Sequence, residues 1–342
     1  MKKLLCLLMV FILIFGLSSC KYARYVYLDT SSSDISDENT YDNSDISSEI
    51  NINASTPLFW KVTSDDSDGV IWLFGSIHVA DESAYPLPDV IMSAFEASDA
   101  LAVECDVENA DFDYNKFYQS MLYKDGSTID DHIPSEVFEE ALKILEEKYG
   151  KQRVESFIYY KPIMWYMLID EIYRSECELT FDYGLDSYFM DLADEDDKEI
   201  LEIESLEFQY NMFLNFSAEL QEFMLSDTIN YTIEDYTQNI YNTYEAWKSG
   251  DIDYLEEMLL GEPPAGYYSK EELLLINEYN KAMIIDRNIG MFDTAEEYLA
   301  DDMEVFYVVG EGHMLGEDGI VQLLTDAGYN VERIISYTGS NI

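Results

Sequence analysis

Two segments near opposite ends of this chain share one layout, and this repeat constrains the fold more than any other feature. In each, an apolar run leads into Gly-x-x-His, a helix follows, and a second apolar run closes the unit. The first copy comprises 73–78, 89–97 and 101–104, and the second comprises 308–313, 319–327 and 331–335. Two βαβ-like units of this kind predict parallel strands joined by right-handed crossovers.

The segment between the two units has a different pattern. Residues 134–298 indicate mainly amphipathic helices, for example 137–149, in which Val137, Ala141 and Leu145 share one face. A short strand at 198–204 interrupts them. We therefore predict an α/β fold in which two βαβ-like halves form a mostly parallel sheet, with a large helical insertion between them.

The predicted domain organisation follows from these patterns. We assign 57–342 to one folded domain, with its core at 57–130 and 299–342 and a mainly helical middle at 131–298. Residues 21–56 are rich in Ser, Asp and Asn and predict a flexible acidic tether.

The first twenty residues have the pattern of a secretory signal. Lys2 and Lys3 precede an apolar run at 4–17, which is shorter than the about 20 residues that a membrane span needs. The following Ser-Ser-Cys resembles a bacterial lipobox, so we expect Cys20 to become the lipidated first residue of an extracytoplasmic protein anchored to the membrane. An uncleaved anchor and cleavage without lipid are the alternatives.

Charge and cysteine content exclude several classes of protein. The formal net charge is −51 at pH 7, which disfavours nucleic acids as partners because a polyanion would be repelled. Outside the signal the chain has two cysteines, Cys105 and Cys177, too few for a disulfide scaffold. A single bridge between them and two free thiols are both compatible with the sequence.

The predicted domain contains three histidines, and two of them occupy the same position after a strand and a glycine. Gly75 and Gly310 suit a sharp exit from a strand, and His78 and His313 follow three residues later. Strand ends of this kind meet at one edge of an α/β sheet, where ligand sites usually form. An imidazole there can act as a metal ligand or a proton carrier. We interpret His132, in a polar turn, as structural or superficial.

Acidic residues end two of the predicted strands. Glu104 follows the run at 100–103 and Glu204 ends the run at 200–204, with Ser205 placed to cap the next helix. Glu104 suits a metal ligand or general base. In a chain with 70 acidic residues, both carboxylates could equally be solvated strand ends.

Arg287 stands out because the chain has few arginines. A guanidinium among apolar helical residues can stabilise an oxyanion or clamp a substrate carboxylate. The alternative is an ion pair with Asp186 or another acid that fastens helices together.

Taken together, these motifs resemble the TraB/GumN family, which is related to the TIKI proteins. The residues that carry the resemblance are Leu73-Phe74-Gly75-Ser76-Ile77-His78, Tyr85-Pro86-Leu87-Pro88, Ala100-Leu101-Ala102-Val103-Glu104, Gly184-Leu185-Asp186, Glu204 with Gln209, Arg287-Asn288 and Val309-Gly310-Glu311-Gly312-His313-Met314-Leu315-Gly316. They cover essentially the whole predicted domain. Ser76 replaces the more usual Thr, and Glu311 stands where a small residue is common.

The resemblance implies an α/β core around a helical insertion and, by similarity to TIKI proteins, a divalent-metal-dependent peptidase. It places His78, His313 and Glu104 at the centre as metal ligands. It implies supporting roles for Arg287, Asn288, Asp186 and Glu204, beside the two turn glycines. Glu311 would add a carboxylate near the site that tunes metal preference or faces solvent.

The functional hypothesis from the sequence is metal-assisted hydrolysis of an amide bond in an extracytoplasmic peptide or protein. Two histidines with carboxylates suit Mn, Co, Fe or Zn about equally. The sequence contains neither a His-Glu-x-x-His helix nor a Gly-x-Ser-x-Gly elbow. The alternatives are metal-free ester hydrolysis with His78 as general base, and a lipid-anchored binding or signalling module that sequesters a peptide or a metal.

Overall fold

The computed structural model describes residues 58–107, 110, 112–261, 263 and 265–335. The predicted signal, Cys20 and the tether lie outside these residues. A six-stranded sheet forms the core, in the order β4-β3-β5-β2-β1-β6. Its strands are β1 (Leu58–Thr63), β2 (Val70–Ser76), β3 (Ala100–Val103), β4 (Glu199–Glu202), β5 (Glu304–Gly310) and β6 (Asn330–Arg333).

The sheet is mostly parallel, as the sequence predicts. β2 pairs with β5, β5 with β3 and β3 with β4 in parallel, while β1 is antiparallel to both of its neighbours. The strands of each predicted βαβ unit are not direct neighbours. Instead β5 lies between β2 and β3, so that the two units interlock.

The sequence did not predict strand β1. Its residues Leu58 to Thr63 are largely apolar and β-prone, and Leu58, Phe59 and Val62 are fully buried. β1 lies between β2 and β6, so β6 closes one edge of the sheet by pairing with β1.

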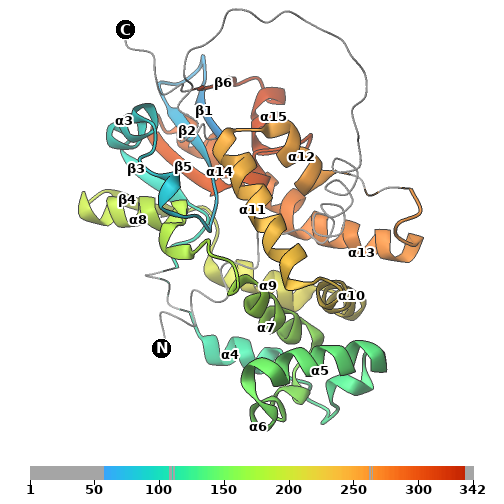
Figure 1. The fold of residues 1–342 in the computed structure, drawn as a ribbon. Coiled ribbons are helices and arrows are strands. Elements are labelled where there is room, and N and C mark those ends of the chain that lie inside the picture. The colour runs from blue at the N-terminus through green and yellow to red at the C-terminus, as the bar shows by residue number, and fades with distance from the viewer. Residues whose placement is uncertain (1–57, 108–109, 111, 262, 264, 336–342) are drawn as a thin grey trace, which may run out of the picture.

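Thirteen α-helices surround the sheet or extend from it in the described ranges (Figure 1). They are α3 (Asp89–Ala97), α4 (Tyr114–Ser120), α5 (Ser135–Tyr149), α6 (Lys151–Val154), α7 (Pro162–Arg174), α8 (Leu185–Glu195), α9 (Leu206–Asn215), α10 (Ala218–Ile229), α11 (Ile233–Ser249), α12 (Ile252–Leu260), α13 (Lys270–Asn280), α14 (Asp286–Ala300) and α15 (Ile320–Asp326). The predicted helices at 89–97 and 137–149 are α3 and α5, and α5 begins two residues earlier than predicted.

Helices cover both faces of the sheet. On one face, Phe306 of β5 packs against Phe95 of α3 and Phe189 of α8, with ring centroids 5.5 and 4.6 Å apart. On the other face, the Tyr307 hydroxyl donates a hydrogen bond of 2.7 Å to the carbonyl of Met291 in α14. Burial of these large aromatic rings on the sheet contributes apolar area to the core on both faces.

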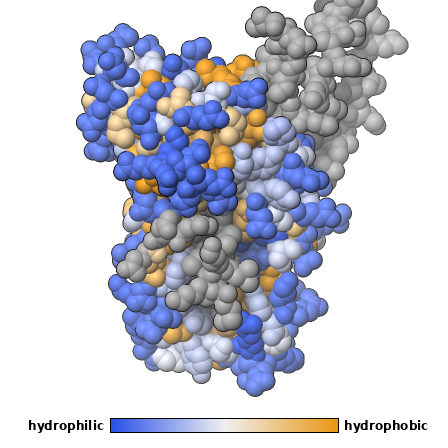
Figure 2. Space-filling view, turned by 90° about the vertical axis from the view of Figure 1, so that its left-hand side faces the viewer, coloured by the Kyte–Doolittle hydropathy of each residue, from blue (hydrophilic) through white to orange (hydrophobic). Residues whose placement is uncertain are grey.

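Helices α4 to α7 lie at the lower end of the molecule, farthest from the sheet, whereas α8 and α14 of the helical insertion lie beside the sheet (Figure 1). Within the described residues, no helix is long and apolar enough to cross a membrane. The face seen in Figure 2 is mostly hydrophilic, and its hydrophobic residues gather in small patches in the upper half. This distribution fits a chain whose charged residues lie outside a packed core.

The packing of α14 against the start of β2 generates a test of the fold. A Cβ atom at Gly69 would lie 2.5 Å from the carbonyl oxygen of Leu299, so Gly69→Ala should lower the free energy of unfolding by about 1–3 kcal/mol. Gly290 in α14 has open space instead, and Gly290→Ala should raise stability by about 0.5–1 kcal/mol. Urea denaturation measures both. Equal stabilities for the two variants would contradict this packing.

Candidate functional site

The two Gly-x-x-His turns leave neighbouring strands at one edge of the sheet. In the parallel β2–β5 ladder, Ser76 lies opposite Gly310. Glu104 follows β3, on the other side of β5. A methyl group on Gly310 would lie 3.4 Å from Glu104 Oε1, 3.7 Å from His78 Nε2 and 3.8 Å from His313 Cδ2. Three buried side chains from distant parts of the sequence therefore converge over this glycine.

The ring of His78 is held by a carboxylate. Its Nδ1 lies 2.6 Å from Asp186 Oδ2, and the Ser76 hydroxyl donates a hydrogen bond of 2.8 Å to the other oxygen of Asp186. Nε2 faces Gly310. Burial lowers the pKa of His78, but the Asp186 charge and hydrogen bond outweigh it and raise the pKa to about 9.

Gly184 allows the start of α8 to approach His78 closely enough for Asp186 to contact its ring. Gly184 precedes α8, and a Cβ atom there would lie 2.3 Å from the carbonyl oxygen of His78. Leu185 N–H donates a hydrogen bond of 3.0 Å to the Ile77 carbonyl. The start of α8 thus docks directly on the histidine turn, which explains the glycine of the Gly-Leu-Asp motif.

His313 is held by an amide. Its Nδ1 lies 2.6 Å from Asn288 Oδ1, and Asn288 Nδ2 donates a hydrogen bond of 2.7 Å to the Asp318 carbonyl. Because the amide oxygen can only accept, Nδ1 carries the hydrogen and Nε2 keeps its lone pair in the neutral ring. Burial and the nearby Arg287 charge lower the pKa of His313 to about 3.

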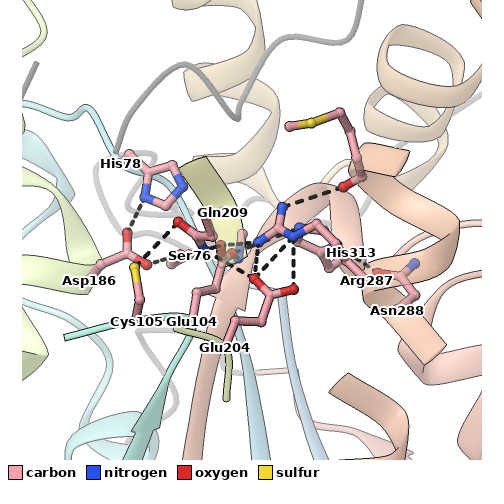
Figure 3. A network of polar contacts seen from close by, with 12 residues as sticks. Ser76, His78, Glu104, Cys105, Asp186, Glu204, Gln209, Arg287, Asn288 and His313 are labelled. Atoms are coloured by element: carbon pink, nitrogen blue, oxygen red, sulfur yellow. Dashed lines mark hydrogen bonds and ion pairs between the residues drawn. The ribbon is translucent and has the colours of Figure 1, made fainter. Parts of the chain in front are cut away.

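A buried ion cluster supports this pair. Arg287 donates hydrogen bonds of 2.5 Å to Glu104 Oε2 and 2.8 Å to Glu204 Oε2, and Gln209 Nε2 lies 3.3 and 3.0 Å from the same two oxygens (Figure 3). The two glutamates are adjacent because Glu204 N–H donates to the Glu104 carbonyl, beyond the β3–β4 ladder. Strand β4 ends at Glu202, before the predicted end at 204, so Glu204 lies just beyond its strand, as Glu104 does beyond β3. Arg287 therefore pairs with two acids that follow strands, and Asp186 pairs with His78 instead.

The charged groups of this cluster shift each other's pKa values. Burial raises the pKa of Glu104, but the Arg287 guanidinium outweighs it and holds the pKa well below its usual range. Burial lowers the pKa of Arg287, and the two glutamates raise it above its ordinary value. Glu104 also accepts a hydrogen bond of 2.8 Å from Gly310 N–H, which ties the cluster to the second histidine turn.

A small pocket of about 40 Å³ opens over these groups. Its polar lining includes both histidines, Glu104 and Glu311, and its apolar lining includes Leu259 and Ile284. Glu311 is 2% exposed, and in the described part of the chain its Oε1 has no hydrogen-bond partner. Burial raises its pKa to about 7. Glu311 therefore does not face solvent, which was one of the two expectations for it, and its effect on metal preference stays a prediction.

A short π-helical segment, Lys281–Ile285, joins α13 to α14 beside the pocket. Met283 and Ile284 line the pocket, and Arg287 and Asn288 follow directly. Such segments are rare and often accompany functional sites, because the wider turn changes which side chains face inward. The sequence carried no recognisable signal for this segment or for the apolar lining from α12.

The remaining predicted residues lie outside the pocket. Gly75 packs in the sheet, where a Cβ atom would lie 2.9 Å from Leu58 Cβ. His132 is exposed and stacks on Tyr123 at 4.0 Å, which agrees with a structural role. Cys105 and Cys177 are free thiols rather than a disulfide, and Cys105 Sγ lies 3.3 Å from Gln209 Oε1.

The donor set fits a divalent metal in part. Both rings have Nδ1 engaged by an acceptor and direct the other edge towards Gly310, which is the usual support of metal-ligating histidines. Gly310 also leaves a space that a Cβ atom would fill. Among the described residues, no three His, Cys, Asp or Glu side chains already form a metal-binding cluster. Two of the ligands of a bound metal ion would be the imidazoles of His78 and His313, and Glu104 or Glu311 would provide a carboxylate ligand.

Fold and site together define an α/β protein with paired histidine turns above a buried arginine–glutamate cluster. The chain belongs to the TraB/PrgY/gumN family, whose model matches residues 58–333. This confirms the family indicated by the sequence motifs.

Two relatives illustrate the membership. The chain is 23% identical over 261 residues to the uncharacterized protein YbaP of Escherichia coli (strain K12). The aligned region covers 74% of this chain and 86% of YbaP. YbaP of Shigella flexneri matches to the same extent. No solved structure matches this chain.

The ion cluster generates a stability prediction. Arg287→Met would leave two adjacent buried carboxylates without their cation, so the free energy of unfolding should fall by about 3–5 kcal/mol. Adding Glu204→Gln should restore part of the loss, because one uncompensated charge is removed. Arg153→Met, at an exposed arginine, should change stability by less than about 0.5 kcal/mol. Urea denaturation at neutral pH checks this, and a small effect of Arg287→Met would show that the cluster is not buried.

Proposed function

We propose that the protein is a divalent-metal-dependent hydrolase that cleaves amide bonds in extracytoplasmic peptides or proteins. The observation that carries the proposal is the pair of buried imidazoles over Gly310. Each is fixed through Nδ1, one by Asp186 and one by Asn288, beside the buried carboxylate of Glu104. Two restrained imidazoles with adjacent carboxylates are a common ligand set for Mn, Co, Fe or Zn.

A bound divalent ion would supply a Lewis acid that activates water and polarises a carbonyl. His78 and His313 would hold it, with Glu104 or Glu311 as carboxylate ligand. The free Oε1 of Glu311 lines the same pocket and is suited to accept a proton from the attacking water. Arg287 is a positioning residue, because it contacts Glu104 and Glu204 and lies beneath the pocket.

The proposed setting follows from the N-terminal sequence. Lipidation at Cys20 and the tether at 21–56 would place the domain outside the cytoplasm, tied to the membrane. Peptides and extracellular proteins are among the molecules that such a domain would meet there.

Metal content tests the proposal directly. Full-length protein purified in detergent without chelator should carry about one divalent ion per chain, and the His78→Ala, His313→Ala double variant should lose it. His132→Ala is the matched control and should keep the ion, since His132 is exposed and outside the pocket. Mass spectrometry measures the ion, and far-UV circular dichroism verifies that each variant folds.

The same experiment separates the alternatives. A wild-type protein that takes up no ion after incubation with Mn, Co, Fe and Zn salts would overturn the metal hypothesis. Ester hydrolysis that is retained and increases as the pH rises towards about 9 would then favour His78 as a metal-free general base, because Asp186 orients its ring and raises its pKa. Retained peptide binding without turnover would favour the binding module.

Gly310→Ala tests where the ion lies. The backbone φ of −54° suits alanine, and the added methyl meets its neighbours at ordinary contact distances, so the fold should persist. The methyl would nevertheless occupy the space between the two imidazoles. Metal affinity should fall on the order of tenfold or more, measured by competition with a chelating dye. Gly312→Ala, whose methyl would contact only apolar atoms, is the control. Unchanged affinity in Gly310→Ala would place the ion elsewhere.

A further inference from the structure

A second cavity adjoins the pocket that contains the histidines. It has a volume of about 500 Å³, in the range of sites that bind small molecules or short peptide segments. The two cavities share the side chains of Leu260, Asn280 and Ile284 as a common wall. We call this larger cavity the groove.

The lining of the groove has one sign of charge. Asp253, Glu256 and Glu257 come from α12, and Glu317 and Asp318 come from the loop after the second histidine turn. No lysine, arginine or histidine lies among the described lining residues. Four of the five acids are exposed, and only Glu256 is partly buried, where its Oε1 accepts a hydrogen bond of 3.1 Å from Gly316 N–H.

The floor between these acids is apolar. It is formed by Leu260, Ile284, Ile285 and Leu315. An apolar floor with carboxylates at its rim matches a lysine or arginine side chain, which buries its methylene stem and keeps its charged head near acids and water.

A second observation, in the adjoining histidine pocket rather than in the groove itself, points to a ligand. Glu311 lines the adjoining pocket, is almost fully buried, and has one oxygen without a hydrogen-bond partner among the described residues. A buried unpartnered acceptor is costly unless another molecule satisfies it. A substrate that runs along the groove into the pocket would bring its polar groups close to this carboxylate.

We propose that the groove selects substrates with lysine or arginine residues next to the bond that is cleaved, so that the preferred ligands are cationic peptide segments. The proposal rests on the proposed peptidase function for its catalytic meaning, but the binding preference can be measured separately. The overall negative charge would attract such peptides at a distance, and the groove would recognise them at contact.

Binding of two matched peptides tests the groove without any need for turnover. One labelled nonapeptide carries two lysines, and its twin carries both lysines N-acetylated. Fluorescence anisotropy should show that full-length protein in detergent binds the cationic peptide about tenfold more tightly, with a preference that shrinks as salt is raised. The His78→Ala, His313→Ala variant should show the same preference, which separates this test from the metal hypothesis.

Neutralising the groove identifies where the preference arises. The triple variant Asp253→Asn, Glu257→Gln, Glu317→Gln should lose most of the preference. The control Glu136→Gln, Glu139→Gln, Glu147→Gln removes the same charge from exposed positions of α5, at the other end of the molecule (Figure 1), and should keep it. Equal binding of the two peptides would overturn the proposal, and so would an equal loss in both triple variants. Cleavage that ignores peptide charge would overturn it while leaving the hydrolase function intact.

Discussion

The parallel insertion of β5 between β2 and β3 is the constraint on which the rest of this structure depends. It places the two Gly-x-x-His turns side by side and puts Glu104 next to the second of them. The carboxyl ends of parallel strands meet at one edge of a sheet. His78, Glu104 and His313 therefore share one buried site, although the first and the last are more than two hundred residues apart in the sequence. The sheet itself is an apolar platform, with Phe74 and Phe306 stacked on one face.

Placing so many ionisable groups in a buried position requires compensation within the site. Arg287 supplies it for Glu104 and Glu204, and Gln209 satisfies the same two carboxylates. Removing charges from water costs nearly as much as their attraction returns, so the intact cluster adds little net stability, although the loss of one partner is costly. Its effect is to hold Glu104 ionised and fixed below the histidines.

The two histidines share a sequence motif and differ in electrostatic state. The neighbouring carboxylate raises the pKa of His78 against the effect of burial, whereas burial and the charge of Arg287 lower the pKa of His313. The difference arises from α8 and α14, which contribute Asp186 and Asn288 respectively. The helical insertion therefore gives two similar turns distinct environments, and it also forms the acidic wall of the groove through α12.

The sequence by itself determined the elements whose physics is local. The apolar runs specified β2, β3 and β5, the internal repeat located α3, and the amphipathic spacing specified α5. The Ser205 hydroxyl caps α9 as predicted, accepting a hydrogen bond from Phe208 N–H. The repeated motif also indicated that His78 and His313 share an edge. These features depend on side-chain periodicity and short-range hydrogen bonds, which can be recognised in a single segment.

Only the tertiary structure decided which groups pair. Arg287 could have bonded any acid, and its selection of Glu104 and Glu204 depends on the β3–β4 register and on the path of α14. The burial of Glu311, the approach of Gly184 to His78 and the groove behind Ile284 likewise arise from segments that meet across the fold. Such contacts have no local signature, because their energies depend on the dielectric and packing that many distant residues create together.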